Sequence, residues 1–392
     1  MLDLTRYLAG PYGAMLLADM GAEVIKIEEP NGGDPIRQAG PPFVNGESAY
    51  YLSINKNKQS VVIDLRQPAG QDLFARLAEK SDVVIENYRP GVVKRLGIDY
   101  PTLAPRNPRL VYCSISGFGQ TGPYRDRPAY DLIFQAMGGG ISITGTEDGQ
   151  LARQGLGIGD LAAGMFAAFG VASCLAERER TGKGRYLEVS ALDGQIALLG
   201  YIAGYYFADG RILGPQGTGH DTMVPYGMFP AADGNVVIAC FTDAFWRKLC
   251  AAIDRSEWAD DPGLATIPQR RERKKEVVAR LTQEFKRFTR DELLDRLYAA
   301  EVPAGPVYNV AEALNDRQVR SRGMVVDVEH PAYGPFKVTG NPIKIEGCED
   351  AAVSPAPVLG EQTEPVLRGL LELSDAELTE LAGRGVINPG PK

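Results

Sequence analysis

Histidine is scarce in this chain, and its scarcity narrows the possible chemistry. Only His220 and His330 occur among the 392 residues. A metal site with several histidine ligands is therefore excluded, and a Ser-His-Asp triad would have to use one of these two. His330 precedes Pro331 in a segment that predicts a surface turn. Hydrolase and histidine-rich metalloenzyme interpretations lose most of their support.

Paired cysteines and long apolar runs are also missing. The five cysteines are scattered without a Cys-x-x-Cys pair, which speaks against zinc sites and disulfides and favours a reducing cytoplasm. The most apolar segment, residues 161–170, contains two glycines and is soon followed by the charged run 177–180, so we expect no membrane span. Leu2 and Leu4 already look like part of a strand, and we expect no secretory leader.

Positive charge is not in excess. The net charge of -8 and the pI near 5.1 argue against nucleic acid or an anionic membrane as the main partner. The chain also lacks a phosphate loop of the Gly-x-x-x-x-Gly-Lys-Ser/Thr type, a Gly-x-Ser-x-Gly elbow and a His-Glu-x-x-His motif. Gly10-Pro11-Tyr12-Gly13 is a poor match to a dinucleotide-binding turn. These absences weaken the nucleotidase, hydrolase and dehydrogenase interpretations.

What the first part of the chain does contain is an alternation of strand-like and helical segments. Apolar strand-like segments at 2–4, 24–27, 61–65, 83–85 and 110–114 alternate with helical patterns such as 11–20 and 68–80. This alternation predicts an α/β fold with a parallel, doubly wound sheet, in which ligands bind outside the carboxyl ends of the strands. The polar residues at those ends are Glu28, Asn87, Tyr88 and the loop 117–123.

The later part of the chain differs in amino-acid composition and in its expected secondary structure. Glycine, tyrosine and proline are frequent from about 188 to 232, and a shorter strand near 235 precedes charged helices at about 243 to 301. This pattern indicates a second, smaller α+β domain. We therefore predict a large domain over 1–190, a linker over 191–221, a small domain over 222–320, and a segment 321–392 that returns to the large domain.

Asp160 is the most informative single residue. It follows the spaced glycines Gly155, Gly157 and Gly159 and opens a helix predicted for about 160 to 180. Small neighbours would let a ligand approach the carboxylate, and the amides and positive dipole end of the helix start would keep it ionised and nucleophilic. The alternative is that Asp160 only caps the helix, a common role for aspartate. Taken alone, these residues leave both interpretations open and favour the cap.

Motifs along nearly the whole chain carry a family resemblance. These segments are, in order, 2–11, 21–28, 55–58, 86–91, 117–123, 159–160, 302–307 and 357–363. Together they resemble the class III coenzyme A transferases, the family of formyl-CoA transferase and carnitine CoA-transferase. The stretch 217–220 followed by 224–226 is most similar to the branch that acts on dicarboxylyl-CoA esters, such as succinyl-CoA:glutarate transferases.

The resemblance implies more than the residues alone. It implies two protomers threaded through each other as an interlocked homodimer, each with a Rossmann-like large domain and a small domain. It implies that Asp160 attacks an acyl-CoA thioester and carries first an acyl anhydride and then a CoA thioester, before a carboxylic acid acceptor receives the CoA. Coenzyme A is then a substrate, and no metal or permanently bound cofactor is needed.

The resemblance also assigns binding residues. It places Tyr130 near the thioester, although a tyrosine there could equally pack a helix start, and Ala9 could equally be a tight-turn residue. Glu29 and Pro128 stand where relatives often have cations, so the phosphates would depend on other cations, such as Arg37, Arg66 or Arg95. The implied contacts to coenzyme A are Leu8 and Ala9 for the pantetheine, Ile63 and Arg66 on the adenine side, and Asn87, Tyr88 and Arg95 elsewhere.

Substrate choice and two rival functions stay open at this point. Arg153 or His220 could bind the distal carboxylate of a dicarboxylic acid, or could serve local structure only. A 2-methylacyl-CoA racemase of the same fold would need a second base, supplied there by histidine in Gly-His-Asp. This chain has Ala129-Tyr130-Asp131, and tyrosine, with a pKa near 10 in peptides, is a poor base at neutral pH. The other rival is a non-catalytic acyl-CoA-binding homologue.

Overall fold

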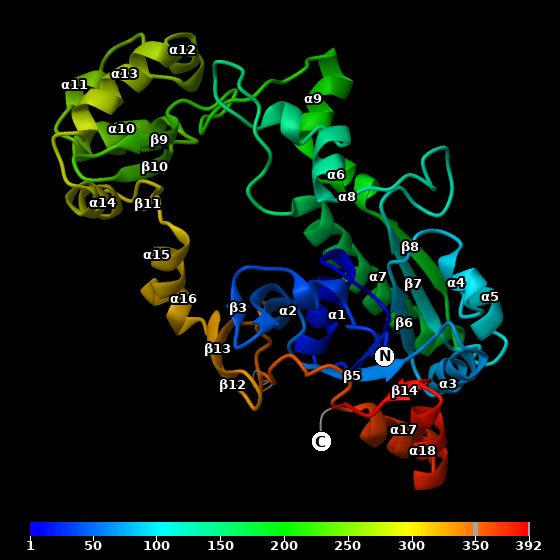
Figure 1. Cartoon of the computed structure of the whole chain (residues 1–392). Helices are drawn as coiled ribbons and strands as arrows, with labels where there is room; N and C mark the ends of the chain where they lie inside the picture. Colours follow the sequence, from blue (N-terminus) through cyan, green and yellow to red (C-terminus); the bar gives the residue numbers. More distant parts are fainter. Residues whose placement is uncertain (348–351, 391–392) are drawn as a thin grey trace. The chain divides into compact units, whose positions relative to one another are not determined.

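A computed structural model describes residues 1–347 and 352–390. The chain forms two compact units (Figure 1). The large unit comprises residues 1–140, 153–211 and 317–392, and the small unit comprises 141–152 and 212–316. Each unit has a hydrophobic core of its own.

The large unit is built on a seven-stranded sheet that is parallel except at one edge. The edge strand β14 pairs antiparallel with β5, and every other pair of neighbouring strands is parallel. This confirms the predicted α/β class with a mainly parallel sheet. In spatial order the strands are β14 (Ile387–Asn388), β5 (Lys58–Ile63), β2 (Val24–Glu28), β1 (Leu2–Asp3), β6 (Val83–Glu86), β7 (Val111–Ser116) and β8 (Tyr186–Ser190).

The order of the strands creates a switch point beside β1. Leu2 pairs with Ile25 of β2 on one side and with Val84 of β6 on the other. The chain builds outward from β1 to β2 and β5, then returns and builds outward through β6, β7 and β8. The loops after β1 and β6 therefore leave in opposite directions and open a crevice at the carboxyl ends of the strands, where α/β proteins bind ligands.

Helices cover both faces of this sheet. α1 and α7 pack against one face, where Val24, Val83 and Ile85 meet Ala14 and Ala163. The helices of the large unit are α1 (Ala9–Asp19), the 3-10 helix η1 (Pro35–Gln38), α2 (Ala49–Ile54), α3 (Pro68–Glu79), α4 (Val92–Arg95), α5 (Tyr100–Leu103), α6 (Asp131–Met137), α7 (Ile158–Thr181), α8 (Ala191–Ala197), α9 (Tyr201–Asp209), α16 (Arg317–Ser321), α17 (Thr363–Leu371) and α18 (Asp375–Gly383).

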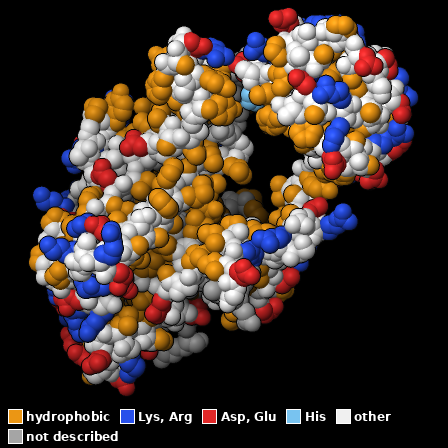
Figure 2. All heavy atoms as spheres, turned by 180° about the vertical axis from the view of Figure 1, so that it is seen from behind, with side chains coloured by type: hydrophobic (Ala, Val, Ile, Leu, Met, Phe, Trp, Pro, Cys, Tyr) orange, Lys and Arg blue, Asp and Glu red, His pale blue; other side chains and the backbone are white. Residues whose placement is uncertain are grey.

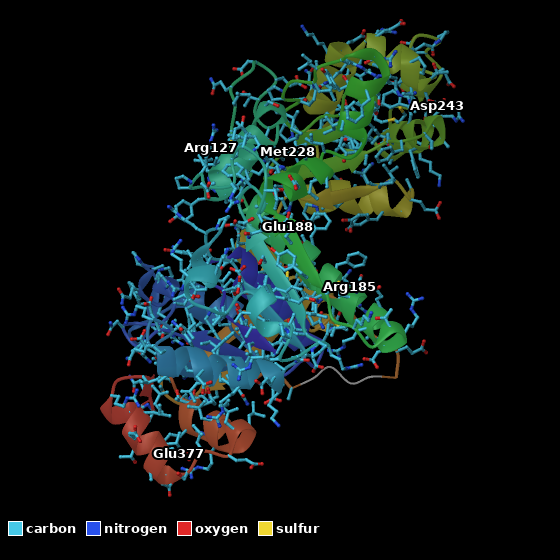
Figure 3. All side chains as sticks on the ribbon, turned by 90° about the vertical axis from the view of Figure 1, so that its right-hand side faces the viewer. Arg127, Arg185, Glu188, Met228, Asp243 and Glu377 are labelled. Atoms are coloured by element: carbon cyan, nitrogen blue, oxygen red, sulfur yellow. The ribbon has the colours of Figure 1, made fainter. Side chains whose placement is uncertain are left out.

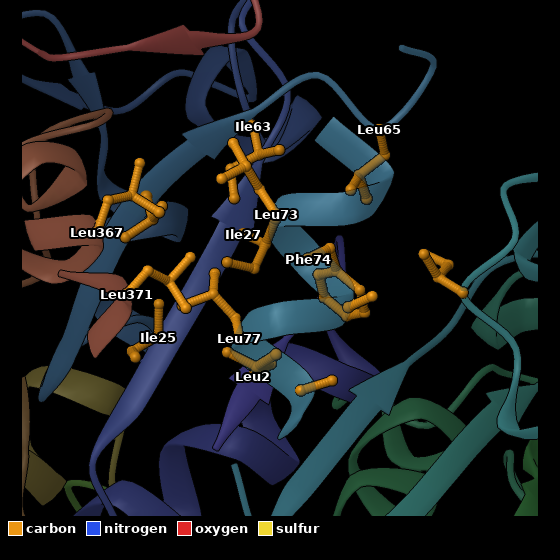
Figure 4. Close-up of a cluster of buried hydrophobic side chains, with 14 of the residues drawn as sticks. Leu2, Ile25, Ile27, Ile63, Leu65, Leu73, Phe74, Leu77, Leu367 and Leu371 are labelled. Carbon is orange, nitrogen blue, oxygen red and sulfur yellow. The ribbon is translucent and has the colours of Figure 1, made fainter. Parts of the chain in front are cut away.

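The other face is covered by α3 and α17, which come from distant parts of the sequence. Ile25 and Ile27 of β2 and Val84 of β6 pack on this face, whereas Val24, Val83 and Ile85 pack on the face of α1 and α7, as the period of two in a strand requires. Leu73 and Phe74 of α3 and Leu367 of α17 complete the cluster (Figure 4). The C-terminal segment is therefore part of the core of the large unit.

Two small hairpins complete the strands of the large unit: β3 (Phe43–Val44) with β4 (Glu47–Ser48), and β12 (Val325–His330) with β13 (Gly334–Thr339). His330 in β12 is 3% exposed, and its Nε2 lies 2.7 Å from the Ala356 carbonyl oxygen. The predicted surface turn is present at residues 331–333. His330 itself is buried, and its Nδ1 accepts hydrogen bonds from the amides of Ala332 and Tyr333 in that turn.

The small unit is an antiparallel sheet covered by helices, with Trp246, Phe229 and Phe285 in its core. Its α+β composition matches the prediction made from its charged helices and short strands. Its elements are the 3-10 helix η2 (Ile141–Ile143), β9 (Tyr226–Pro230), β10 (Asn235–Ala239), α10 (Asp243–Ala252), α11 (Ser256–Ala259), α12 (Ile267–Glu272), α13 (Lys274–Phe285), α14 (Arg290–Ala299), β11 (Ala304–Pro306) and α15 (Val310–Asn315).

The observed division of the chain differs from the predicted ranges. Residues 141–152 belong to the small unit rather than to a large domain over 1–190. Much of the stretch 191–221, predicted as a linker, is helical, because α8 and α9 occupy 191–197 and 201–209 within the large unit. Leucine and alanine there favour helix. Gly200 and Gly210 lie at the two ends of α9, and the helix continues through Gly204.

α7 is longer than we expected from the two glycines in its apolar segment. It runs without a break through Gly164 and Gly170. Within the described parts of the chain it is the one helix that is long and apolar enough to cross a membrane by length and composition, with a mean hydropathy of 1.7 and a third of that window buried. The expectation of no membrane span was based on the glycines and the charged run, and neither keeps this helix below that length and apolar character. Four described cysteines are free thiols, and Cys348 lies outside the described residues.

Candidate active site

A cavity of about 190 Å³ lies in the large unit at the predicted edge of the sheet. Its walls come from the loops that follow β1, β6 and β7 and from the start of α7, so it occupies the switch point beside β1. It brings together six of the predicted site residues, which are Leu8, Ala9, Asn87, Tyr88, Tyr130 and Asp160.

Asp160 stands in the first turn of α7, but it does not cap the helix. The N-cap position is Gly157, and the capping acceptor comes from another helix. Asp131 of α6 receives hydrogen bonds at Oδ1 from the amides of Gly159, at 2.9 Å, and Asp160, at 3.3 Å. No hydrogen bond or ion pair holds the Asp160 carboxylate within residues 1–347 and 352–390. The capping interpretation of Asp160 is therefore wrong, because Asp131 does that work.

Burial, and to a smaller extent the negative charge of Asp131, together raise the pKa of Asp160 to about 7. We expected the helix start to keep this acid fully ionised, and the structure contradicts that. The amides that would stabilise the charged form are bound to Asp131 instead. A carboxylate with few hydrogen bonds and a raised pKa is a better nucleophile than an ordinary aspartate once it is ionised.

The spaced glycines before Asp160 have a packing role. A Cβ at Gly159 would lie 3.1 Å from Cβ of Phe134 and 3.2 Å from Oδ1 of Asp131, and one at Gly157 would lie 3.1 Å from Leu8. Around Gly155 the space is open. Gly157 and Gly159 therefore let the start of α7 approach α6 and Leu8. The expectation that small residues here let a ligand approach Asp160 stays a prediction, and Gly155 is the position that leaves open space.

Three tyrosines stand near Asp160. Tyr7 and Tyr130 both line the cavity, with ring centroids 6.0 Å apart in an edge-to-face arrangement. Tyr7 has a positive φ of 65°, and its amide donates to Asp34, which fixes the turn after β1. Burial raises the pKa of Tyr50 to about 12, and the charge of Asp160 is the next largest cause, so Tyr50 also lies within electrostatic reach of that carboxylate.

Asn87 and Tyr88 hold the opposite wall together. The side chain of Asn87 accepts from the Arg6 amide at 2.8 Å and donates to the Arg6 carbonyl at 2.7 Å. The Arg6 guanidinium donates to the Tyr88 hydroxyl at 3.3 Å and also pairs with Glu29 at 3.4 Å. Asn87 thus fixes the loop after β1, a role that the sequence did not reveal.

Positive charge reaches the cavity through three arginines, Arg89, Arg125 and Arg127. Arg125 and Arg127 are exposed and come from the loop between β7 and α6, and Arg127 is labelled in Figure 3. The Arg127 guanidinium lies over the ring of Tyr124, 3.8 Å from its centroid. None of these three arginines was predicted from the sequence as a site residue. A clue was present in the sequence: Arg125 and Arg127 lie just before Pro128, the position where relatives often have a cation.

Other predicted residues lie away from the cavity walls. Ile63 is 1% exposed in the core beneath α3 (Figure 4), so its side chain cannot contact an adenine there. Arg66 is exposed and pairs with Asp64 at 2.8 Å, and Arg95 is exposed in the last turn of α4. Arg153 is exposed in the large unit, seven residues before Asp160. His220 belongs to the small unit, where its ring meets Tyr226 edge to face.

Arg37 is also unavailable to a phosphate, against expectation. It is 6% exposed, and its guanidinium binds Glu28 at 2.7 Å and Glu47 at 3.0 Å. The same group lies over the ring of Tyr51, 3.7 Å from its centroid. Arg37 therefore holds β2, β4 and α2 together.

Within the described residues, no cluster of three or more histidine, cysteine, aspartate or glutamate side chains could hold a metal ion.

The model of one protein family, CoA-transferase family III, matches residues 1–363. The chain belongs to this family. Its relatives include a succinyl-CoA:glutarate CoA-transferase from Homo sapiens, 36% identical over 99% of this chain and 89% of that protein. An acetyl-CoA:oxalate CoA-transferase from Acetobacter aceti is 40% identical over 92% of each chain, and a succinyl-CoA:mesaconate CoA-transferase from Haloarcula hispanica is 39% identical over 94% of each.

Solved structures agree with this membership. The crystal structure of a CAIB/BAIF family protein from Brucella suis superposes with a TM-score of 0.85 at 36% identity, and covers 94% of this chain and 97% of the other. The family resemblance drawn from the motifs is thereby confirmed, and so is the conclusion that the chain is a CoA-transferase. As a CoA-transferase it uses CoA thioesters as substrates, and the cavity around Asp160 is its candidate active site.

Proposed function

We propose that this CoA-transferase moves CoA from succinyl-CoA, or another dicarboxylyl-CoA, to a carboxylic acid acceptor through covalent intermediates on Asp160. One observation carries the proposal: the Asp160 carboxylate opens into the switch-point cavity, while Asp131 occupies the helix amides that would otherwise bind it. The names of the relatives support the choice of donor, since several act on succinyl-CoA.

The first half of the reaction loads the enzyme. An Asp160 oxygen attacks the acyl carbonyl carbon of the donor, the C–S bond breaks, and CoA leaves as a thiolate with the electron pair. Asp160 then carries a mixed anhydride with the donor acid. The thiolate attacks the carbonyl carbon of Asp160, which releases the donor acid and leaves a CoA thioester on Asp160. No proton is consumed and each step conserves an activated acyl bond.

The second half runs the same steps with the acceptor. The acceptor carboxylate attacks the Asp160 thioester carbonyl, and thiolate leaves again. The thiolate then attacks the acceptor carbonyl carbon of the new anhydride, and Asp160 departs as a free carboxylate. Hydroxyl groups of Tyr7, Tyr50 or Tyr130 are suited to hydrogen-bond the oxygen that gains charge in these steps. Leu8 and Ala9 supply an apolar wall for the pantetheine arm.

The arginines of the cavity offer binding groups for anions. Arg89, Arg125 and Arg127 can form paired hydrogen bonds with a phosphate or a carboxylate. We assign the phosphates to this group, together with Arg66 and Arg95, whose exposure leaves them accessible. Arg153 and His220 stay as predicted partners of the distal carboxylate of a dicarboxylic substrate.

A paired substitution tests the carboxylate assignment. Arg153→Met should raise KM for a dicarboxylyl-CoA by about tenfold and leave KM for a monocarboxylyl-CoA within about twofold, because only the former loses a charged contact. Arg127→Met serves as the comparison, and should raise KM for both esters if it binds the CoA portion they share. An equal effect of Arg153→Met on both esters would remove Arg153 as the specificity residue.

We also infer a homodimer of the interlocked kind. The large unit exposes many apolar side chains on α6 to α9, and Figure 2 shows such side chains gathered over this face. Phe169 is 74% exposed and Phe207 is 81% exposed. A contiguous apolar surface of this extent is typical of a protein interface. Other members of the patch are Leu132, Ile133, Met137, Leu156, Met165, Phe166, Ile196, Leu198, Tyr201 and Tyr206.

Product analysis tests the function. The protein is incubated with succinyl-CoA and a panel of carboxylic acids, and new CoA esters are followed by mass spectrometry, with Asp160→Asn as the matched variant. We expect esters of one or a few dicarboxylic acids from the wild type and none from the variant. Hydroxylamine added with donor should trap Asp160 as its hydroxamate. Unchanged ester formation by Asp160→Asn would refute the covalent mechanism, and deuterium wash-in at the α-carbon of 2-methylacyl-CoA would point to a racemase.

A further inference from the structure

Two side chains of α6 form hydrogen bonds with each other and with the segment that carries the proposed nucleophile, Asp160. Asp131, at the start of α6, accepts at Oδ1 from the first-turn amides of α7, as described above. Its other oxygen, Oδ2, accepts from the Gln135 side-chain amide at 2.6 Å. Gln135 lies one helical turn later and is completely buried. The two residues therefore act on the same segment from neighbouring positions of one helix.

Gln135 fastens the loop that leads to Asp160. Its Nε2 donates to the Leu156 carbonyl at 3.1 Å, and its Oε1 accepts from the Gln154 amide at 2.8 Å. The loop 154–157 is thus held at both ends by one side chain, and Asp131 holds the residues that follow. Together with the close packing of Gly157 and Gly159 described above, these bonds hold residues 154–160 at the start of α7.

We propose that Asp131 and Gln135 are positioning residues for the transfer reaction: together they fix the loop 154–160 and occupy the amides of the α7 start, so that the Asp160 carboxylate stays free of hydrogen bonds and aimed into the cavity. This inference rests on the proposed role of Asp160 as the nucleophile. It assigns a function to the glycine spacing and to an aspartate that the reaction scheme does not use.

The physical reason lies in competition for the helix amides. The start of a helix offers unpaired amide groups to any nearby carboxylate. Without Asp131, the closest acceptor for them is the Asp160 side chain, which would then be hydrogen-bonded, stabilised as an anion and turned toward its own helix. Both changes weaken the attack on a thioester, because the nucleophile must first break those bonds.

The charged and titratable groups that face Asp160 come from several elements. Asp131 on α6 and Tyr50 on α2 act on it directly. The remaining such groups on the cavity walls are Tyr7, Tyr88, Arg89, Arg125, Arg127 and Tyr130. Asp131 is the one carboxylate among them whose charge opposes the ionisation of Asp160.

Three variants of the full chain test the proposal. Asp131→Asn removes the charge and the second acceptor, and Gln135→Leu removes the loop fastening with little change of volume. Asp99→Asn is the matched control, since Asp99 occupies the N-cap position of α5 in the same unit and lies outside the cavity walls. Each is assayed for kcat, KM and the pH dependence of kcat/KM with succinyl-CoA and the acceptor found for the wild type.

We expect kcat to fall by about 10- to 100-fold in Asp131→Asn and in Gln135→Leu, the scale of a small misplacement of a reacting group, while KM for the donor stays within about threefold. In Asp131→Asn the acidic limb of kcat/KM should also move down by about one pH unit, because a neighbouring negative charge is lost. Asp99→Asn should keep the wild-type values. A fall in kcat that only follows the folded fraction, with an unmoved limb, would overturn the proposal.

A second readout does not need turnover. The pH dependence of thermal unfolding is compared between each protein and its Asp160→Asn partner, in the wild-type and Asp131→Asn backgrounds. In each background, the difference in stability between the protein and its Asp160→Asn partner changes with pH as Asp160 ionises. The midpoint of this change should lie about one pH unit lower in the Asp131→Asn background than in the wild type. An unchanged midpoint refutes the positioning role. Absence of transfer by the wild type, with a moved midpoint, would instead refute the proposed function.

Discussion

The Asp160 side chain occupies a place that destabilises the folded chain. A carboxylate that is removed from water needs hydrogen bonds or a counter-charge, and Asp160 has a neighbouring carboxylate instead. Catalytic groups often stand in such surroundings, because a solvated and well-bonded anion is a poor nucleophile. Other buried carboxylates differ in this respect: Glu28 and Asp3 have the cationic partners Arg37 and Lys58. Glu86 instead accepts hydrogen bonds from the Ser114 hydroxyl and the Tyr88 amide, and burial raises its pKa to about 7.

Replacing Asp160 with asparagine should stabilise the protein in a pH-dependent way. The pKa of Asp160 is raised from 3.8 to about 7, so the folded state holds a proton that the unfolded state loses between about pH 4 and pH 7. Stability therefore falls as the pH rises through this window, and the full penalty is present above pH 7. Asparagine removes the penalty.

We expect the stabilisation by Asp160→Asn to be larger at pH 8 than at pH 5 by at most roughly 3 kcal/mol. Urea unfolding of both proteins at the two pH values measures it. A stabilisation that is the same at pH 5 and pH 8 would show that Asp160 has an ordinary pKa in the folded chain.

The rate of the reaction should depend on the same ionisation. Only the carboxylate form of Asp160 can attack the thioester, and its pKa is about 7. We expect kcat/KM for the donor to be level above about pH 8 and to fall about tenfold per pH unit well below pH 7. A stopped assay of CoA transfer between pH 5 and pH 9 tests this. Full activity retained at pH 5 would contradict it.

At the scale of elements, the crossing of α1 and α7 determines where Asp160 stands. A Cβ at Gly164 would lie 2.5 Å from the Ala9 carbonyl oxygen, and one at Gly13 would lie 2.7 Å from the Gly164 carbonyl oxygen. The two backbones therefore touch, as they can only where both helices lack side chains. This contact holds the start of α1, which carries Leu8 and Ala9, close to the start of α7.

Adding one methyl group at this crossing should be costly. Gly164→Ala should destabilise the protein by about 1 to 3 kcal/mol, because neither backbone can move away without disturbing the sheet beneath. Gly369→Ala is the matched control: it lies inside α17 with open space around it, and alanine should stabilise that helix by about 0.5 to 1 kcal/mol. Equal effects at both positions, measured by urea unfolding, would contradict the tight crossing.

Elements with a strong local pattern could be predicted from the sequence. The buried strands β2, β6 and β7 and the second half of β5 are rich in apolar residues, and turn residues separate them from the helices that follow. The prediction of a strand over 61–65 missed the polar start of β5 at Lys58, Gln59 and Ser60, and β5 ends at Ile63. β8 was missed because it alternates exposed and half-buried residues at the end of the sheet, and β14 because it has two residues. Their pairing depends on contacts with distant strands, which no local pattern reports.

The same distinction applies to the candidate site. Asp160, Asn87 and Tyr88 could be found because they follow predicted strands or open a predicted helix. Asp131 and Gln135 act on a segment about 20 to 30 residues later in the chain, through single hydrogen bonds without a motif. Arg37 looked accessible in the sequence and is buried, because its partners Glu28 and Glu47 come from two other elements.

At the scale of the whole molecule, the apolar face of the large unit predicts self-association. We expect the wild type to be a dimer by light scattering after gel filtration. Phe169→Glu should shift it toward monomers, because a charge within an apolar interface loses its water without gaining a partner. Ala376→Glu on exposed α18 adds the same charge outside the patch and should leave the dimer intact. A monomeric wild type would refute the dimer.

The return of the C-terminal segment to the large unit has a consequence for the order of folding. During synthesis, the edge of β5 stays open until β14 has emerged, and the core under α3 lacks Leu367 and Leu371 for the same period. Residues 212–316, which form most of the small unit, leave the ribosome well before that. The small unit can therefore fold first, while the sheet that carries the active site is completed only by the last residues of the chain. A nascent chain stalled before residue 363 would expose an unpaired strand edge, the kind of surface that chaperones bind and aggregates extend.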